Sequence, residues 1–239
     1  MGNSHAQHLV PMLDEVALNN GFRYVALTIS NCRLTSATQL VHGISFKFDL
    51  CKEYFDRYSV FVDKNAKKGD VVLIGSKSLF FKPKKDHEND NSRAFMGAKN
   101  ISRLDLFNHA KSELGLFLAK LSERGVHLIF AGPTPEYSLS ATQCYEEWFR
   151  KRRSGCAVDF KTAKIKLFAL EEYLSHPPFN SLPITIWNPL LDLCDAGKCE
   201  IQRGEELLFR DKHHLSLQGS RSLAANFDLL LRDVLEKKN

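Results

Sequence analysis

Short apolar segments alternate with longer amphipathic ones along nearly the whole chain, and this alternation limits the fold more than any other feature. The apolar segments that we expect to form strands are residues 24–30, 71–75, 126–131, 183–187 and 207–209. Helical spacing predicts helices between Ser4 and Gly21, over 51–64, 101–124 and 158–174, and through Leu223, Phe227, Leu230, Leu231 and Val234. Strands that alternate with helices form a parallel sheet with helices on both faces, so we predict an α/β fold.

Length and composition favour one globular domain over residues 1–239, with a core large enough to fold without a metal. The chain has 239 residues, of which 44% are hydrophobic and 26% charged, and this excludes a disordered or collagen-like protein. Its longest apolar runs, residues 71–74 and 126–131, are far shorter than the about 20 residues of a membrane helix. The net charge of +5 is spread along the sequence apart from one basic run at residues 150–153, so a nucleic-acid partner is not indicated. We also expect the chain to be a monomer.

The first residues carry neither the basic nor the apolar segment of a secretory signal. They lead at once into Gly2-Asn3-Ser4, which is typical of a turn from a strand into a helix. A parallel sheet would place a strand upstream of this turn. We therefore interpret the sequence as part of a longer protein whose first strand precedes Met1, with a mis-assigned start codon as the alternative.

The cysteines are even in number and fall into local pairs, namely Cys32 with Cys51, Cys144 with Cys156, and Cys194 with Cys199. We predict three disulfides, which would place the domain in an oxidising compartment. Zinc is the alternative. However, no pair has the Cys-x-x-Cys spacing, and no histidines are spaced as a second ligand pair would be.

Ser4 is a candidate nucleophile because it follows Gly2 and Asn3 at the start of a predicted helix. Backbone N–H groups are unsatisfied at such a position and the helix dipole favours negative charge, so an oxyanion would be stabilised. The same Gly-Asn-Ser sequence is also typical of an ordinary helix cap. Taken alone, it leaves both interpretations open.

A candidate acid-base pair lies near the other end of the chain, where Asp211 and His214 form the one Asp-x-x-His of the sequence. A serine nucleophile needs an imidazole base that a carboxylate holds in the correct tautomer, and a short turn can present both side chains. His213 competes with His214 for this role. A His-His pair before a helix also fits a surface turn or a metal site.

Taken together, these segments resemble the sequence blocks that characterise one protein superfamily. Gly2-Asn3-Ser4-His5-Ala6 resembles the first block of the SGNH (GDSL-type) esterase and acyltransferase superfamily, and Asp211-x-x-His214-Leu215-Ser216-x-x-Gly219 resembles its last block. More narrowly, the chain is similar to the C-terminal SGNH domains fused to membrane acyltransferases of family 3, which O-acetylate bacterial surface polysaccharides. Supporting marks are Ser30-Asn31-Cys32, Cys51, Gly132-Pro133-Thr134-Pro135-Glu136 and the loop from Cys194 to Cys199. The resemblance covers nearly the whole chain.

The resemblance implies an SGNH-hydrolase-like (flavodoxin-like) three-layer sandwich with a catalytic triad of Ser4, Asp211 and His214. It implies transfer of an acetyl group to a sugar hydroxyl of a bacterial surface polysaccharide or lipopolysaccharide through an acyl-Ser4 intermediate. It also implies a periplasmic or extracytoplasmic location and a fused membrane domain upstream, which would handle the acetyl donor. No cofactor and no metal are expected in this chain.

The chain departs from the superfamily pattern in the groups that would bind an oxyanion. Asn3 stands where the first block usually has Asp, and Gly75-Ser76-Lys77-Ser78 stands where a Gly-x-Asn-Asp block is expected. The glycine of the second block is not evident either. The Ser4 N–H is then the leading candidate donor, with Asn31, Ser76 and Lys77 as further candidates.

Two other functions compete with acyl transfer. With water as the acceptor, the same triad would make the chain a carbohydrate esterase or deacetylase. A non-catalytic glycan-binding module would instead use exposed aromatic residues such as Trp148 and Trp187, and burial of both is the alternative. Two further segments each allow two interpretations. Residues 150–153 would either hold an anionic glycan or form a solvated basic loop. Residues 81–100 would form either a lid or an ordinary surface loop.

Overall fold

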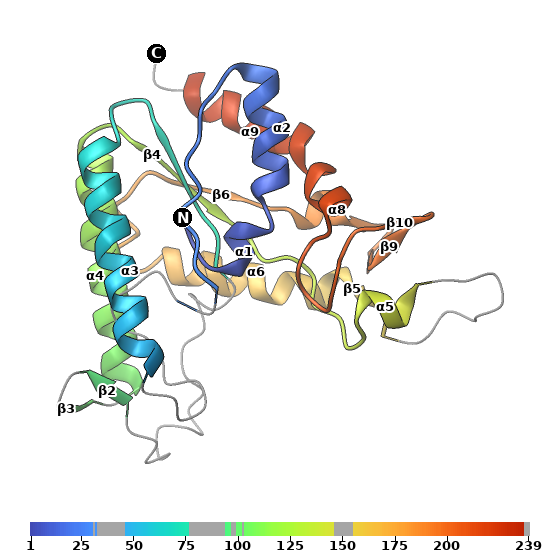
Figure 1. Cartoon of the computed structure of the whole chain (residues 1–239), viewed down its shortest axis with the longest axis horizontal. Helices are drawn as coiled ribbons and strands as arrows, with labels where there is room; N and C mark the ends of the chain where they lie inside the picture. The colour runs from blue at the N-terminus through green and yellow to red at the C-terminus, as the bar shows by residue number, and fades with distance from the viewer. Residues whose placement is uncertain are drawn as a thin grey trace.

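The computed structural model describes residues 1–30, 32, 46–76, 94–96, 99–101, 103–145 and 155–236. At its centre is a parallel sheet in which strands β1 (Val71–Ile74), β4 (His127–Ala131) and β6 (Ile184–Trp187) lie side by side in the order β1-β4-β6 (Figure 1). The register is regular, with Val72 opposite Leu128 and Phe130 opposite Ile186. The expected α/β fold with a parallel sheet is therefore confirmed.

The first residues of the chain extend this sheet beyond β1. Gly2 bridges Gly75 on one side and Thr28 on the other, and both bridges are parallel. The Gly75 N–H donates to the Met1 carbonyl at 3.0 Å, and the Gly2 N–H donates to the Leu27 carbonyl at 3.1 Å. The start of the chain thus occupies a strand position between β1 and the segment that contains Thr28.

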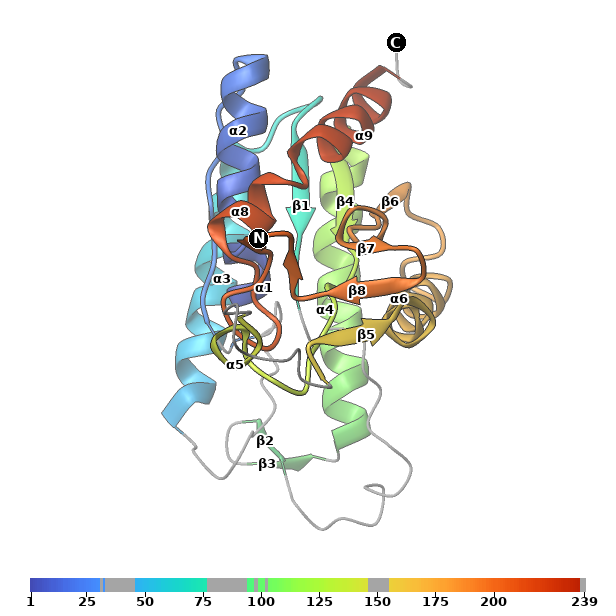
Figure 2. The ribbon, with the colours of Figure 1, turned by 90° about the vertical axis from the view of Figure 1, so that its right-hand side faces the viewer.

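Helices cover both faces of the sheet, because side chains alternate between the faces along each strand. On β4, Ile129 and Ala131 face one hydrophobic cluster, whereas Leu128 and Phe130 face another. The first cluster is covered by α2 (Val10–Asn20) and α9 (Ala224–Glu236), and the second by α3 (Phe46–Asn65), α4 (Arg103–Glu123) and α6 (Phe160–Leu174). Figure 2 shows α2 and α9 in front of β1 and β4, with α3 and α4 behind.

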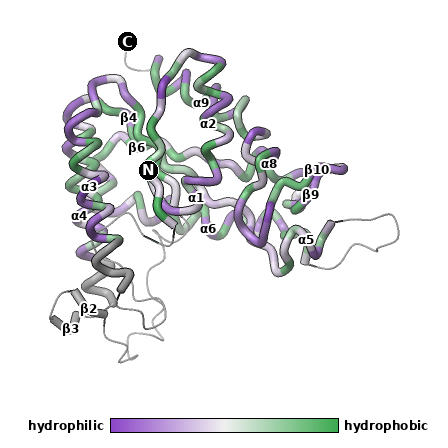
Figure 3. The backbone as a smooth tube through the Cα atoms, viewed as in Figure 1, coloured by the Kyte–Doolittle hydropathy of each residue, from purple (hydrophilic) through white to green (hydrophobic). Residues whose placement is uncertain are grey.

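The hydropathy of the chain follows these three layers. Figure 3 shows hydrophobic stretches along β4 and β6, while the outer helices alternate hydrophilic and hydrophobic positions. In α9, the buried residues are Ala224, Phe227, Leu231 and Val234, which recur at helical spacing. The final predicted helix is therefore confirmed.

The helix expected between Ser4 and Gly21 is divided into α1 (Ser4–Gln7) and α2. Pro11 lies in the first turn of α2, where its missing N–H leaves no hydrogen bond unmade. Gly21 ends α2 in the left-handed conformation with φ 67°, which glycine adopts without a steric penalty. The division separates the short helix that carries Ser4 from the longer helix that packs on the sheet.

Residues 24–30 do not form the buried strand that their composition predicts. Only Thr28 makes a β-bridge, and Val25 is 64% exposed. Residues 1–3 pair with residues 27–29 but do not reach the earlier part of this segment. It therefore has no neighbouring strand among the described residues over residues 22–26.

Short elements complete the described part of the fold. They are β2 (Ala94–Met96), β3 (Lys99–Ile101), α5 (Ala141–Cys144), β5 (Ala157–Asp159), α7 (Leu190–Leu193), β7 (Cys194–Asp195), β8 (Lys198–Glu200), β9 (Gln202–Arg203), β10 (Glu206–Leu207) and α8 (Leu217–Arg221). A helix is predicted over residues 158–174, but its first two residues belong to strand β5, which pairs with β8, and the helix α6 begins after them. No helix in the described ranges is both long and apolar enough to cross a bilayer.

All three predicted disulfides are present: Cys32–Cys51, Cys144–Cys156 and Cys194–Cys199. The first attaches residue 32 to α3, the second joins the end of α5 to the start of β5, and the third joins β7 to β8. The zinc alternative is therefore excluded for these cysteines, since every sulfur is bonded to another sulfur.

Candidate active site

Three side chains that are far apart in the sequence form a continuous chain of hydrogen bonds. The Nε2 atom of His214 lies 2.9 Å from Ser4 Oγ, and its Nδ1 atom lies 2.7 Å from Asp211 Oδ2. In this geometry an imidazole can remove the serine proton while the carboxylate fixes the imidazole tautomer. The structure thus brings together the three residues that the sequence singled out.

Asn3 holds the turn that carries Ser4 from two directions. Its Oδ1 atom accepts the His5 N–H at 2.9 Å and so caps α1, and its Nδ2 atom donates to Ser76 Oγ at 3.1 Å. An ionised aspartate could cap the helix but could not donate to Ser76. Ser76 therefore lies beside the nucleophile turn, whereas the other two oxyanion candidates, Asn31 and Lys77, lie outside the described residues.

Gly2 is required by a close approach of two backbone segments. A Cβ atom at this position would lie 1.8 Å from the Gly75 carbonyl oxygen and 2.6 Å from the Ala6 Cβ atom. Both distances are far below van der Waals contact, so only glycine fits. The glycine lets α1 begin directly against the end of β1, and this places Ser4 within reach of His214.

The turn that carries Asp211 and His214 is fixed by the carboxylate itself. Asp211 Oδ1 accepts the backbone N–H of His213 at 2.9 Å and that of His214 at 2.8 Å. Partial burial alone would raise the pKa of Asp211, but these two hydrogen bonds and the one from the His214 ring hold it below its usual range. The carboxylate is therefore charged at neutral pH and able to stabilise a protonated His214.

The loop after β4 supports the same turn from outside. Thr134 Oγ1 donates to the His213 carbonyl at 3.3 Å, and the Tyr137 N–H donates to the Lys212 carbonyl at 2.8 Å. The sequence had marked residues 132–136 only by their resemblance to a family block. Their role in the structure is to orient the backbone of residues 211–214.

His214 makes a direct contact with Ser4. The His213 ring lies beside that of His214, with 4.1 Å between their centroids, and its Nδ1 atom is 3.3 Å from Asp211 Oδ1. Both histidines therefore share one carboxylate. The 2.9 Å contact with Ser4 favours His214 over His213 as the candidate base.

His8 is a residue of the site that the sequence reasoning missed. It is 6% exposed, its Nδ1 atom accepts the Leu215 N–H at 3.3 Å, and its ring lies edge-on to that of His214. Burial, together with the nearby charges of His214 and Arg210, lowers the pKa of His8 to about 3, so the ring is neutral. The sequence did carry a signal for His8. It lies four residues after Ser4, and residues at this spacing in a helix lie on the same side.

Three histidines near the triad also bring possible metal ligands together. One ring nitrogen from each of His5, His213 and His214 lies within 4.8 Å of the others. However, both ring nitrogens of His214 are already hydrogen-bonded, to Asp211 and to Ser4. A metal bound to His214 would have to displace either Asp211 or Ser4, so metal binding and the complete chain of contacts exclude each other.

A cavity of about 20 Å³ adjoins the site, with His8, Ser76 and Thr134 among its lining residues. A space of this size holds about one water-sized group. It is far too small for a sugar. Outside this cavity the site is open to solvent, since the Asp211 side chain is 40% and the His213 side chain 28% exposed.

The aromatic residues proposed for a glycan-binding module divide into two cases. Trp187 is 3% exposed and packs edge-on against Phe227, with ring centroids 4.9 Å apart, so it cannot stack on a sugar. Its assignment to a buried strand is confirmed. Trp148, the basic run 150–153 and residues 81–93, 97 and 98 of the lid candidate lie outside the described residues.

The three-layer fold and the hydrogen-bonded Ser4, His214 and Asp211 define a class of α/β proteins built around a serine triad. The chain belongs to the family of SGNH domains fused to AT3 domains, whose family model matches residues 1–229. The resemblance inferred from the first and last sequence blocks is thereby confirmed.

Comparison with solved structures supports the same fold. The chain is similar to the structure of the Salmonella ser. Paratyphi A lipopolysaccharide acetyltransferase periplasmic domain, with a TM-score of 0.61 and 16% sequence identity. The similarity covers 97% of this chain and 81% of that chain. No curated protein sequence matches this chain.

Proposed function

We propose that this chain is a serine-dependent O-acyltransferase domain that transfers an acetyl group to a sugar hydroxyl of a bacterial surface polysaccharide or lipopolysaccharide. The observation that carries the proposal is the continuous contact from Asp211 through His214 to Ser4, at 2.7 and 2.9 Å. Membership in a family fused to AT3 domains and similarity to a lipopolysaccharide acetyltransferase domain support the choice of acyl group and acceptor.

The mechanism uses Ser4 twice. The Nε2 atom of His214 takes the Ser4 hydroxyl proton as Ser4 Oγ attacks the acetyl carbonyl, and the proton then passes to the leaving group as its bond to the acetyl carbon breaks. In the second half, His214 takes the proton of the sugar hydroxyl, the sugar oxygen attacks the acyl-enzyme, and Ser4 Oγ recovers the proton. The Ser4 N–H and the Ser76 hydroxyl are our candidates for stabilising the oxyanion in both steps.

The proposal includes a location outside the cytoplasm. Disulfides persist in oxidising compartments, and this chain has three of them. The similar Salmonella chain is described as a periplasmic domain. We therefore assign the domain to the extracytoplasmic face of the inner membrane, tethered to a family 3 acyltransferase domain that handles the acetyl donor, and we assign no cofactor to the domain itself.

The test is hydrolysis of p-nitrophenyl acetate by the oxidised protein, compared with Ser4→Ala and His214→Ala. Both substitutions should lower kcat by about 10⁴-fold or more, because members of a triad act as a unit. Mass spectrometry after rapid quenching should find one acetyl group on Ser4 of the parent and none in Ser4→Ala. An active parent whose activity survives Ser4→Ala would refute the proposal.

The alternative function is a carbohydrate esterase, in which water replaces the sugar as the acceptor. The partial exposure of Asp211, at 40%, favours it, because water can reach the edge of the site. Product analysis with p-nitrophenyl acetate and added surface polysaccharide distinguishes the two functions. Acetylated polysaccharide indicates transfer, whereas release of acetate from an O-acetylated polysaccharide indicates the esterase.

A further inference from the structure

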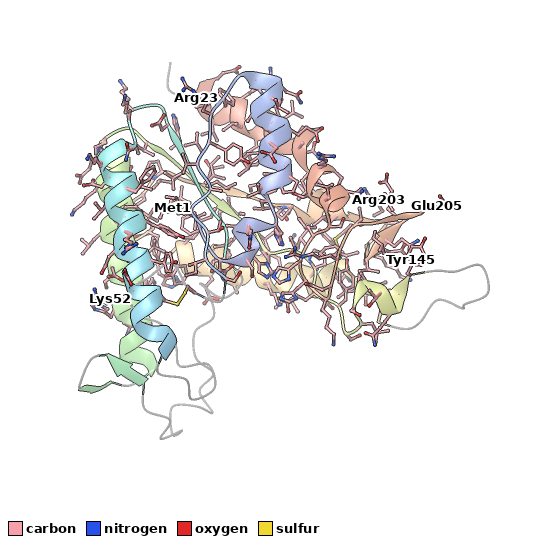
Figure 4. The ribbon with its side chains drawn as sticks, in the orientation of Figure 1. Met1, Arg23, Lys52, Tyr145, Arg203 and Glu205 are labelled. Atoms are coloured by element: carbon pink, nitrogen blue, oxygen red, sulfur yellow. A yellow bond between two sulfur atoms is a disulfide. The ribbon has the colours of Figure 1, made fainter. Side chains whose placement is uncertain are left out.

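Three imidazole rings from distant parts of the chain form one cluster at the site. His5 lies in α1, whereas His213 and His214 lie in the turn between β10 and α8. Figure 4 shows Met1, just before α1, in the interior of the molecule, and Glu205, just before β10, near its edge. One ring nitrogen of each histidine lies within 4.8 Å of the others. Folding thus assembles three nitrogen ligands from two separate segments.

The spacing of these nitrogens suits a transition-metal ion. A zinc ion binds imidazole nitrogens at about 2.1 Å, which places two of them about 3.4 Å apart in a tetrahedral site. Each pair in the cluster therefore has to close by about 1.4 Å or less. Rotation of the His213 ring can supply this movement, because its side chain is 28% exposed at the edge of the site. The cysteines cannot compete for the ion, because all of them are in disulfides.

Asp211 already supplies the outer partner that metal-bound histidines have. Its Oδ2 atom lies 2.7 Å from Nδ1 of His214, and its Oδ1 atom lies 3.3 Å from Nδ1 of His213. An ionised carboxylate favours a proton on the ring nitrogen nearest to it, so each ring keeps Nε2 as its ligand atom. Histidines that bind metals typically donate their other ring N–H to a carboxylate in this way.

The atom that a metal would take from the triad is therefore Nε2 of His214. This atom lies 2.9 Å from Ser4 Oγ, whereas the Asp211 contact is on the opposite side of the ring. A metal on Nε2 replaces the Ser4 contact and leaves the Asp211 contact in place. The negative charge of Asp211 also favours a cation at this position.

We propose that His5, His213 and His214 bind a divalent transition-metal ion of the zinc type, and that this ion reversibly inhibits the site. The bound ion uses the lone pair with which His214 would accept the Ser4 proton, so Ser4 cannot be activated while the ion is bound. Magnesium and calcium do not bind here, because they require oxygen ligands. The inhibitory effect rests on the proposed function, but binding of the ion does not.

Binding is tested by calorimetric titration of the oxidised protein with zinc chloride in the absence of substrate. The parent should bind one zinc ion and no magnesium ion. His213→Gln should weaken zinc binding by about 100-fold or more, because loss of even an outer partner of a metal ligand costs about 10- to 100-fold. His109→Gln, at an exposed histidine of α4, is the matched control and should bind zinc as the parent does.

Ser4→Ala distinguishes this site from metal binding elsewhere on the chain. It should bind zinc at least as tightly as the parent, because no serine hydroxyl then competes for Nε2 of His214. A melting curve without zinc shows that each variant is folded. Equal zinc affinities of the parent and His213→Gln would overturn the proposal.

Inhibition is tested by hydrolysis of p-nitrophenyl acetate at increasing zinc concentration. The rate of the parent should fall in proportion to the zinc occupancy measured by calorimetry, and addition of EDTA should restore it. Full activity of the zinc-loaded parent would overturn the proposal. So would hydrolysis by zinc-loaded Ser4→Ala, because the ion would then be catalytic. If the parent is inactive without zinc, the proposed function fails, and the calorimetry still decides whether the metal site exists.

Discussion

At the scale of single residues, Asp211 shows how local geometry sets the chemistry of the site. Its carboxylate accepts two backbone N–H groups and one imidazole N–H, so it remains charged despite partial burial. The same three bonds fix the turn and the His214 ring. One side chain thus determines the position, the tautomer and the charge environment of the proposed base.

Asp211→Asn should lower kcat for p-nitrophenyl acetate by about 10⁴-fold while leaving the fold intact. An asparagine can still accept the backbone N–H groups, but its amide would donate to His214 and favour the wrong tautomer. Steady-state kinetics and a melting curve check this expectation. Asp195→Asn, which changes a carboxylate that is 77% exposed, is the matched control and should leave kcat unchanged. Similar kcat values for both variants would contradict the assignment.

His8 should make the stability of the protein depend on pH. Its folded pKa of about 3 lies below the about 6.5 of an unfolded histidine, so between these values the unfolded chain binds a proton that the folded chain excludes. The stabilisation is complete above pH 6.5 and is lost as the pH falls towards 3. From pH 7 to pH 5 the loss is about 2 kcal/mol.

His8→Gln should remove this part of the pH dependence, because glutamine does not titrate and keeps an acceptor for the Leu215 N–H. Urea unfolding at pH 7 and pH 5 measures the difference. His109→Gln, at an exposed histidine of α4, is the control and should retain the wild-type slope. Equal slopes for the two variants would show that His8 is already protonated in the folded protein at pH 5.

At the scale of elements, the segment before Asp211 is braced by a disulfide-bonded hairpin. Cys194 and Cys199 lie opposite each other in β7 and β8, and β9 and β10 follow before the chain reaches Phe209. Phe209 bridges Leu215, which closes the turn that holds Asp211 and His214. The hairpin therefore contributes to the orientation of the acid-base pair as well as to stability.

The double variant Cys194→Ser with Cys199→Ser should lose about 2 kcal/mol of unfolding free energy by the loop-closure argument. The same change at Cys144 and Cys156 should cost about 3 kcal/mol, because its loop of 12 residues is longer than the loop of 5 residues. Urea denaturation without reductant provides both values. We also expect lower kcat in the first variant, and an unchanged kcat and midpoint there would refute the bracing role.

The sequence predicts the elements of this fold well where one signal dominates. The final helix is predicted by the spacing of Phe227, Leu231 and Val234, and β4 by its continuous apolar run. Residues 24–30 carry a strand composition but lie exposed over their first part, because a strand needs a neighbour that its own sequence does not specify. The four short strands from β7 to β10 have two or three residues each, which is too short for a periodic signal.

For the candidate site, too, the sequence predicted some features and missed others. The contact of Ser4 with His214 was predictable because both residues lie in recognisable turns. The contribution of His8 and the bond from Asn3 to Ser76 were not, because each depends on packing between distant segments. Burial decides the charge of His8, and burial is a property of the folded chain rather than of the local sequence.

At the scale of the whole molecule, one sheet serves two hydrophobic clusters. Leu128 and Phe130 of β4 pack with α4 on one face, while Ile129 and Ala131 pack with α2 and α9 on the other. A strand that loses its packing on one face loses its order on both. The two clusters are therefore expected to unfold together, as one domain.

Leu118→Ala tests this coupling because Leu118 is fully buried in α4, on the face opposite α2 and α9. The substitution should cost about 3 kcal/mol and should shift every unfolding curve by the same amount. The curves are recorded by far-UV circular dichroism and by the fluorescence of Trp187, which lies in the hydrophobic cluster covered by α2 and α9. Both are measured in a Trp148→Phe background, so that Trp187 is the one fluorescent tryptophan. Leu116→Ala, at a position of α4 that is 67% exposed, should shift neither curve by more than about 0.5 kcal/mol. If Leu118→Ala moved the circular dichroism curve and left the Trp187 curve in place, the chain would consist of two units that fold separately.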